Sequence, residues 1–218
     1  AGNGALLIEV LPANAVANEI NPARADNLRE QGFEVRQENA VEFRMKGADR
    51  VLANPPFGVV RQGDVTDVFS LADIQPGYQT SQIDHVIALR ALQAMREDGR
   101  AVIILGGVHK LVTDPKDRAD AYQGKAKREF FYALYQRYNV TDHFTVAGDL
   151  YAKQGAAWPV DVLVIEGRGK STRRLPSLER REKLLPHPAG ERAQAVGADL
   201  GIGHPGGHHR DIAERGAA

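Results

Sequence analysis

The chain contains no cysteine among its 218 residues. This absence excludes a disulfide scaffold, a thiolate nucleophile and a zinc site with cysteine ligands. Net charge is also lacking, because 28 lysines and arginines balance 28 aspartates and glutamates. A protein that binds nucleic acid through bulk positive charge is therefore excluded, although a local basic patch remains open.

Long apolar segments are missing as well. The apolar runs are short, such as residues 101–105, and lie far below the roughly 20 residues that span a bilayer. The first residues do not place a basic stretch before an apolar one, as a secretory signal would. There is no initiator methionine, and we expect the chain to be part of a longer protein. The 43% of hydrophobic residues suffices for one sizeable core.

Strand-like and helix-like segments alternate along the chain, which predicts an α/β fold with a doubly wound, mostly parallel sheet. Strands are predicted at residues 15–20, 33–37, 50–53, 101–105, 140–146 and 160–165. Helices are predicted at residues 5–11, 22–31, 83–95 and 125–138. The polar, glycine-bearing residues 58–80 predict a long loop, which in a compact domain is usually functional or mobile.

The composition changes after Gly167, where glycine, proline, histidine and charged residues dominate. Residues 168–183 hold seven basic side chains against two acidic ones. We therefore predict one domain over residues 1–167, followed by a basic linker and a disordered tail over 168–218. The alternative for the basic stretch is a contact with nucleic acid. We predict no metal site, although the tail histidines could capture a metal adventitiously.

Two short segments near the start of the chain suit a nucleoside ligand. Gly2-Asn3-Gly4 forms a Gly-x-Gly turn before a predicted helix, and such a turn lets the backbone approach a ligand closely. Glu19 ends the next predicted strand, where a carboxylate can accept from both hydroxyls of a ribose. Asn39 follows the strand after that. A Gly-x-Gly turn alone is a weak signal, and Glu19 alone could be an ordinary exposed carboxylate.

The tetrad Asn54-Pro55-Pro56-Phe57 discriminates between possible ligands. Asn54 offers an amide oxygen, while the two prolines stiffen the backbone and have no N–H to donate. The turn therefore presents acceptors that suit a planar amino group with its two donors. Phe57 can stack on the face of a base. The alternative is a purely structural role, in which the tetrad only ends a strand.

Together these residues resemble the class I S-adenosylmethionine-dependent methyltransferases that act on amino groups, specifically the adenine-N6 type with the Asn-Pro-Pro-Phe/Tyr motif. The resemblance covers about residues 1–167 and implies a Rossmann-like fold with the last strand antiparallel. It implies S-adenosylmethionine as cofactor and N6 of adenine in DNA as the methyl acceptor, in a base that must leave the duplex. It assigns Asn54, Pro55, Pro56 and Phe57 to catalysis. It assigns the cofactor to Gly2, Asn3, Gly4, Glu19 and Asn39.

The chain departs from this family in two respects. The family usually has an acid where this chain has Asn39, and its first strand should precede Ala1, so we expect that strand to be missing.

The family often places an aromatic residue such as Trp158 over the flipped base. The alternative is a structural role, in which Trp158 packs beside Pro159.

The layout of residues 54–167 also resembles the methyltransferase module beside strawberry-notch-type helicases of phages and plasmids. That resemblance implies a linked or partner helicase. We expect a cytoplasmic protein that is encoded by a bacterium, a phage or a plasmid. Two functional alternatives stay open. One is the same chemistry on an RNA base or a glutamine side chain, and the other is a non-catalytic methyltransferase-fold module of a larger helicase protein.

Overall fold

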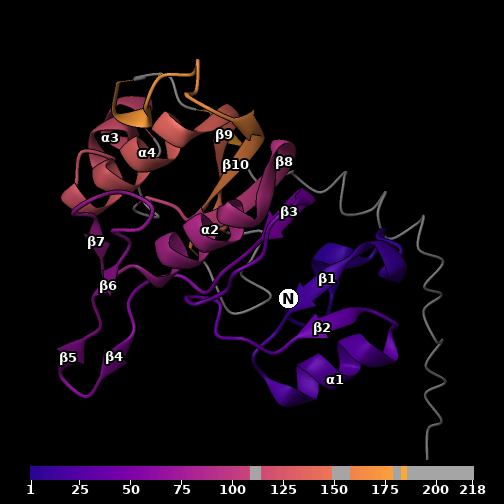
Figure 1. Ribbon diagram of the computed structural model, residues 1–218. Coiled ribbons are helices and arrows are strands. Elements are labelled where there is room, and N and C mark those ends of the chain that lie inside the picture. Colours follow the sequence, from indigo (N-terminus) through magenta and orange to yellow (C-terminus); the bar gives the residue numbers. More distant parts are fainter. Residues whose placement is uncertain (109–113, 149–157, 179–182, 186–218) are drawn as a thin grey trace, which may run out of the picture. The chain divides into compact units, whose positions relative to one another are not determined.

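The computed structural model describes residues 1–108, 114–148, 158–178 and 183–185. All of them lie in one compact unit, residues 1–185, which is drawn in Figure 1. Our predicted domain ends at residue 167, whereas this unit continues through Leu185. The remainder of the predicted tail, residues 186–218, lies outside the described residues.

The larger sheet has five strands in the order β11-β9-β10-β8-β3. β10 (Val160–Arg168) lies between β8 (Met95–Gly106) and β9 (Tyr138–Val146) and runs antiparallel to both. β3 (Ala48–Ala53) pairs in parallel with β8, and β11 (Lys183–Leu185) in parallel with β9. The sheet is therefore mixed. The predicted doubly wound, mostly parallel arrangement is confirmed only in part, since two of these four pairings are antiparallel.

A separate pair of parallel strands is built from the first part of the chain. β1 (Val16–Asn18) pairs with β2 (Glu34–Arg36), and α1 (Pro22–Glu30) connects them. The Asn21 side chain accepts from the backbone N–H of Arg24 and caps α1, whose first helical residue is a proline. These three elements confirm the predictions for residues 15–37 in type, with shorter strands.

The helix predicted at residues 5–11 is wrong. The structure has two 3₁₀ turns there, η1 (Ala5–Leu7) and η2 (Pro12–Asn14). Gly4 precedes η1 with a φ of 88°, in the left-handed region, and no side chain caps that end. An isolated turn of this kind has too few hydrogen bonds to propagate into a longer helix.

Helices α2 (Ile83–Ala94) and α4 (Lys125–Arg137) confirm two predictions and pack on the larger sheet. α2 contacts β3 and β8, while α4 contacts β9. The two helices meet where the ring of His85 stacks on Phe130, with centroids 4.1 Å apart. The short helix α3 (Pro115–Ala121) was not predicted, because its sequence is mostly charged.

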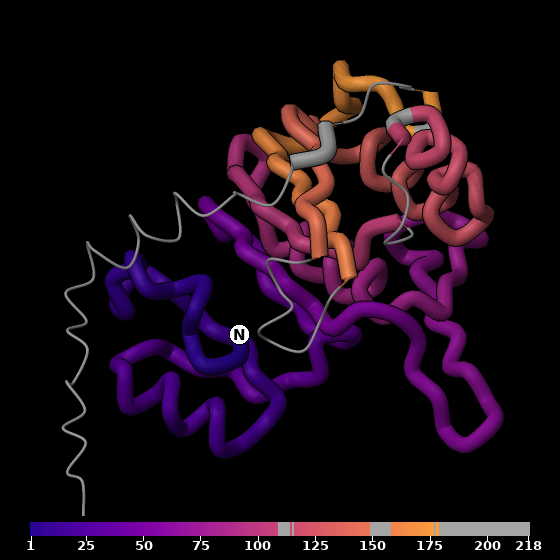
Figure 2. Tube along the Cα trace, turned by 180° about the vertical axis from the view of Figure 1, so that it is seen from behind, coloured from indigo at the N-terminus to yellow at the C-terminus, as the bar shows by residue number. Residues whose placement is uncertain are grey.

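Residues 58–80 are not the continuous loop that we predicted. They form two short hairpins, one from β4 (Arg61–Gln62) and β5 (Val65–Thr66) and the other from β6 (Phe69–Ser70) and β7 (Gln79–Thr80). Leu71, Ile74 and Tyr78 of this segment are buried in the main core, and their spacing does not alternate as it would along a strand. The β4–β5 hairpin projects outward in both views (Figure 1 and Figure 2).

Strand β8 begins at Met95, six residues before the predicted strand, and runs through Gly99. A β-carbon at Gly99 would lie 3.1 Å from the carbonyl oxygens of both Ala48 and Asp49. Glycine here permits the close approach of β3, which also shows a register irregularity between Ala48 and Arg50.

The basic stretch after Gly167 is partly built into this unit. Arg168 donates to the carbonyl oxygens of Leu92, Gln93 and Met95 at 2.7–3.3 Å and so closes the carboxyl end of α2. Ser171 is buried and its hydroxyl donates to the carbonyl oxygen of Val140. A 3₁₀ turn, η4 (Pro176–Leu178), and β11 follow. Within the described residues, no helix is long and apolar enough to cross a membrane.

Candidate active site

The tetrad Asn54–Phe57, which we name the proline corner, directly follows β3 at the carboxyl end of that strand. Asn54 and Pro56 are exposed, Pro55 is buried, and the Phe57 side chain is 37% exposed. The chain leaves the corner through Gly58, whose φ of 97° lies in the left-handed region and whose carbonyl oxygen accepts from the N–H of Ile83. The start of α2 therefore anchors the exit of the corner.

The carboxyl end of β8 lies against the proline corner because β3 and β8 run in parallel, with Ala53 opposite Ile103. β8 ends at Gly106, and Gly107 follows; we call this pair the di-glycine. A β-carbon built on Gly106 would lie 3.2 Å from Cβ and 3.3 Å from Cγ of Phe57. The Phe57 side chain therefore contacts the backbone of the di-glycine.

Trp158 reaches the same di-glycine from the start of β10. Its indole Nε1 donates to the carbonyl oxygen of Gly107 at 3.3 Å, and the N–H of Gly107 donates to the carbonyl oxygen of Pro159 at 2.8 Å. The Trp158 side chain remains 42% exposed. Two half-exposed aromatic side chains, Phe57 and Trp158, thus rest on adjacent residues at the carboxyl end of β8.

Two charged side chains near the di-glycine were not among our predicted site residues. Asp84 lies in the first turn of α2, and its carboxylate accepts from the N–H of Gly106 at 3.2 Å. Lys127, in the first turn of α4, donates to the carbonyl oxygen of Gly106 at 2.8 Å. The di-glycine could have been noticed in the sequence because it follows an apolar strand. No nearby sequence pattern indicates a role for Lys127.

The predicted ribose acid, Glu19, follows β1 and is 6% exposed. One carboxylate oxygen accepts from the N–H of Gly2 at 2.7 Å and from the amino group of Ala1 at 3.1 Å. The other accepts from the N–H of Asn21 at 2.9 Å and from Nε of Arg24 at 3.2 Å. The structure therefore brings Glu19 and the Gly-x-Gly turn together.

These hydrogen bonds determine the charge of Glu19. Burial raises its pKa, but the backbone hydrogen bonds from Asn21 and Gly2 and the amino group of Ala1 lower it more, to about 2 from an ordinary 4.5. The carboxylate is therefore ionised at neutral pH. Gly2 and Gly4 both have positive φ, at 63° and 88°, so the turn has the backbone shape for which glycine is suited.

Asn3 and Asn39 lie at exposed positions. The carbonyl oxygen of Asn3 accepts from the Gln31 side chain at 3.4 Å. Asn39 follows β2, and its side-chain oxygen accepts from the N–H of Val41 at 3.3 Å, which closes a local turn. Their roles toward a cofactor stay predictions.

Several solved structures are similar to this chain. One is a modification subunit assigned to a type I restriction enzyme from Vibrio vulnificus YJ016, with 15% identity, a TM-score of 0.52, and coverage of 87% of this chain and 41% of that one. Another belongs to a type I restriction-modification system, with 16% identity, a TM-score of 0.50, and coverage of 72% and 31%. A third, from Listeria monocytogenes, is assigned to the class I S-adenosylmethionine-dependent methyltransferases, with 10% identity, a TM-score of 0.48, and coverage of 85% and 53%.

The likeness to the first two structures shows that this chain shares their fold. The chain spans about two fifths and one third of the length of those two proteins. No protein-family model matches the chain, and no curated protein matches it. Nothing in the similar structures supports a helicase partner, which stays a prediction.

Proposed function

We propose that this chain transfers a methyl group from S-adenosylmethionine to an exocyclic amine, with N6 of adenine in DNA as the acceptor. The observation that carries the proposal is the exposed proline corner at the carboxyl end of β3, beside the di-glycine that supports Phe57 and Trp158. In open α/β sheets, ligands bind at such strand ends. The modification subunit among the similar structures supports a modification activity for this fold.

The residues near the start of the chain fit the proposed cofactor in their chemistry. Glu19 is an ionised acceptor at the carboxyl end of a parallel strand, as a ribose diol requires. Its oxygens already accept from Gly2, Ala1, Asn21 and Arg24. Of these donors, the Arg24 side chain is half exposed and can move aside for a hydroxyl. When bound, S-adenosylmethionine supplies an electrophilic methyl group.

The residues at the proline corner act on the amine. The side-chain oxygen of Asn54 and the backbone carbonyl beside it accept from the two N–H groups, which biases the nitrogen lone pair away from the ring and toward a methyl donor. Phe57 and Trp158 offer aromatic faces, and stacking contributes about 1–3 kcal/mol per base. No strong base is needed, because the nitrogen becomes acidic once it is methylated.

A base in duplex DNA must leave the helix to reach this corner. Two of the basic residues that we considered for DNA contact have structural partners. Arg168 closes α2, and Arg173 lies 3.6 Å from the Asp142 carboxylate. The hairpins of residues 58–80, which leave directly from the proline corner, are therefore the stronger candidates for contact with the strand.

The proposal includes one further parallel strand in the sheet. Within the described residues, β3 pairs only with β8, so its other edge has no strand partner. The same holds for the edge of β1 that faces away from β2. The family resemblance supplies a first strand between such edges. A strand there would satisfy backbone groups that an open edge leaves unpaired.

Asn54→Ala tests the proposed function, with Asn14→Ala as an exposed asparagine control. Calorimetry measures S-adenosylmethionine binding, and radiolabelled methyl transfer is measured on DNA, RNA and a glutamine peptide. We expect Asn54→Ala to keep cofactor binding and to lose about 10²- to 10³-fold in transfer to DNA. Equal transfer by Asn54→Ala and the parent removes Asn54 from the mechanism.

The other arms of this experiment separate the alternatives. If the methyl group is transferred to RNA or to the peptide but not to DNA, the acceptor is an RNA base or a glutamine side chain and not adenine in DNA. Cofactor binding should also be measured on a chain extended before Ala1. Failure of that extended chain to bind S-adenosylmethionine favours a non-catalytic methyltransferase-fold module.

A further inference from the structure

We propose that Asp84 and Lys127 are positioning residues that hold the N–H and the carbonyl oxygen of Gly106 and thereby fix the surface on which Phe57 and Trp158 rest. This inference depends on the proposed function only for its kinetic consequence. The structural part concerns the di-glycine itself and can be tested without any methyl transfer.

The two contacts to Gly106 come from two different helices. Asp84 of α2 accepts from the Gly106 N–H at 3.2 Å, and Lys127 of α4 donates to the Gly106 carbonyl oxygen at 2.8 Å. Both residues belong to the first turn of their helix. One glycine therefore has its donor bound by a carboxylate and its acceptor bound by an ammonium group, and hydrogen bonds to charged groups are the stronger class.

The pair is largely withdrawn from solvent, which strengthens both contacts. The Asp84 side chain is 3% exposed and Lys127 is half-buried. Burial raises the pKa of Asp84 above its ordinary value, and the Gly106 N–H and the positive charge of Lys127 offset only part of that rise. Burial, followed by the same charge of Lys127, lowers the pKa of the neighbouring His85 to about 3, so that imidazole is neutral. The charge of Lys127 thus acts on both Asp84 and His85.

The di-glycine needs such restraint because of what rests on it. Glycine loses more conformational freedom on folding than any other residue, so two in succession form a flexible segment unless other groups hold them. Phe57 lies on Gly106, and the Trp158 indole donates to Gly107. Movement of the di-glycine would therefore displace both aromatic side chains that the proposed function assigns to the substrate base.

A purely structural role for Asp84 and Lys127 makes a different prediction. Removing a structural contact lowers the free energy of unfolding but leaves the native arrangement of Phe57 and Trp158 unchanged. A positioning role changes the native state itself. Trp158 is the only tryptophan in the chain, so its fluorescence reports on the di-glycine without interference from other indoles.

The experiment compares Lys127→Met and Asp84→Asn with the matched controls Lys125→Met and Asp117→Asn. Lys125 is an exposed lysine of the same helix, and Asp117 is an exposed carboxylate in the first turn of α3. In the folded state we expect both variants to shift the Trp158 emission maximum and to increase its quenching by acrylamide, whereas the controls match the parent. We expect kcat to fall about tenfold at an unchanged Kd for S-adenosylmethionine. Lys127→Arg, which keeps a cationic donor, should restore most of both signals.

Unchanged Trp158 emission and quenching in folded Lys127→Met overturns the inference, whatever the activity. If Asp84→Asn does not fold, Lys127→Met alone decides. If the parent, also when extended before Ala1, transfers no methyl group while Lys127→Met still alters Trp158, the proposed function fails and the positioning of the di-glycine stands. If the parent is active and Lys127→Met changes neither Trp158 nor kcat, the positioning role fails and the proposed function stands.

Discussion

The side chain of Phe57 rests on the bare Cα of Gly106. The two residues are far apart in the sequence, yet a β-carbon at Gly106 would come within 3.2 Å of Cβ and 3.3 Å of Cγ of Phe57. Such distances are tighter than ordinary van der Waals contact, so only glycine leaves Phe57 where it is. The outer surface of Phe57 stays accessible because the side chain is 37% exposed.

Gly106→Ala should reduce methyl transfer much more than it reduces stability. Gly106 has no positive φ, so alanine fits the backbone, and half-exposed Phe57 can swing away from the new methyl group. We expect the free energy of unfolding to change by less than about 1 kcal/mol and kcat/KM to fall about tenfold or more. Urea unfolding and methyl transfer assays measure the two effects. Gly124→Ala is the control, because a β-carbon there meets only one atom, at 3.8 Å.

Gly107→Ala should destabilise the fold itself. A β-carbon there would lie 2.7 Å from the carbonyl oxygen and 2.9 Å from the carbonyl carbon of Pro159, and these backbone atoms cannot rotate away. We expect a loss of about 1–3 kcal/mol in urea unfolding. A Gly107→Ala variant as stable as the parent would show that the start of β10 is not held against the di-glycine.

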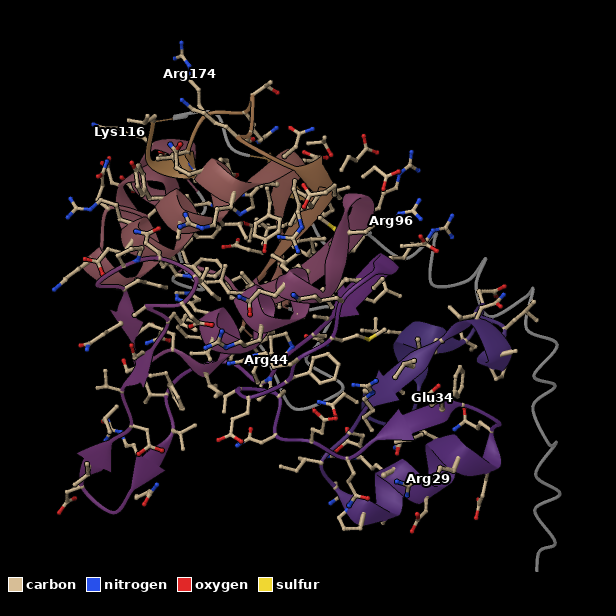
Figure 3. The ribbon with its side chains drawn as sticks, viewed as in Figure 1. Arg29, Glu34, Arg44, Arg96, Lys116 and Arg174 are labelled. Carbon is tan, nitrogen blue, oxygen red and sulfur yellow. The ribbon has the colours of Figure 1, made fainter. Side chains whose placement is uncertain are left out.

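Glu19→Gln should lose stability in a pH-dependent manner. The pKa of Glu19 is lowered to about 2, so its ionised form stabilises the fold above about pH 4.5, and this contribution disappears as the pH falls toward 2. The difference between parent and variant should reach at most about 3 kcal/mol at pH 7 and shrink steadily below pH 4.5. Urea unfolding at several pH values measures it, with Glu34→Gln, an exposed position on β2 (Figure 3), as control. A difference that is constant between pH 7 and pH 3 contradicts the assignment.

Arg168→Ala should destabilise the domain although Arg168 belongs to the stretch we expected to be a linker. Its guanidinium donates to carbonyl oxygens at the end of α2 and lies 5.5 Å from the centre of the Tyr138 ring. We expect a loss of about 1–3 kcal/mol in thermal or urea unfolding. Arg174→Ala, at an exposed arginine on the outer surface (Figure 3), should change stability by less than about 0.5 kcal/mol. If Arg168→Ala and Arg174→Ala change the stability equally, Arg168 does not stabilise the domain and belongs to a linker.

Local rules predicted some parts of the molecule well. The prolines after Ala53 end β3 where expected, because they cannot continue the hydrogen-bond ladder. Asn21-Pro22 begins α1 and the apolar stripe from Ile83 forms α2. Such signals lie within a few residues of one another, so they can be read without knowing the fold.

Other parts depend on contacts that a local pattern does not contain. β8 can continue through Gly99 because this residue, which has no side chain, lies close against β3. Residues 58–80 form hairpins because Leu71 and Tyr78 are buried in the core. The same holds for Lys127, whose contact with Gly106 joins residues from two distant elements. Pairing of this kind is determined by packing across the whole domain.

The sequence by itself determined the chemistry of the individual segments, namely an amide and two prolines at a strand end and glycines where the backbone turns left-handed, since these properties belong to single residues. Only the tertiary structure decided which segments meet. Parallel pairing of β3 with β8 places Phe57 on Gly106, and antiparallel β10 places Trp158 on Gly107. Strand order and register follow from burying one shared core, and no short stretch of residues specifies them alone.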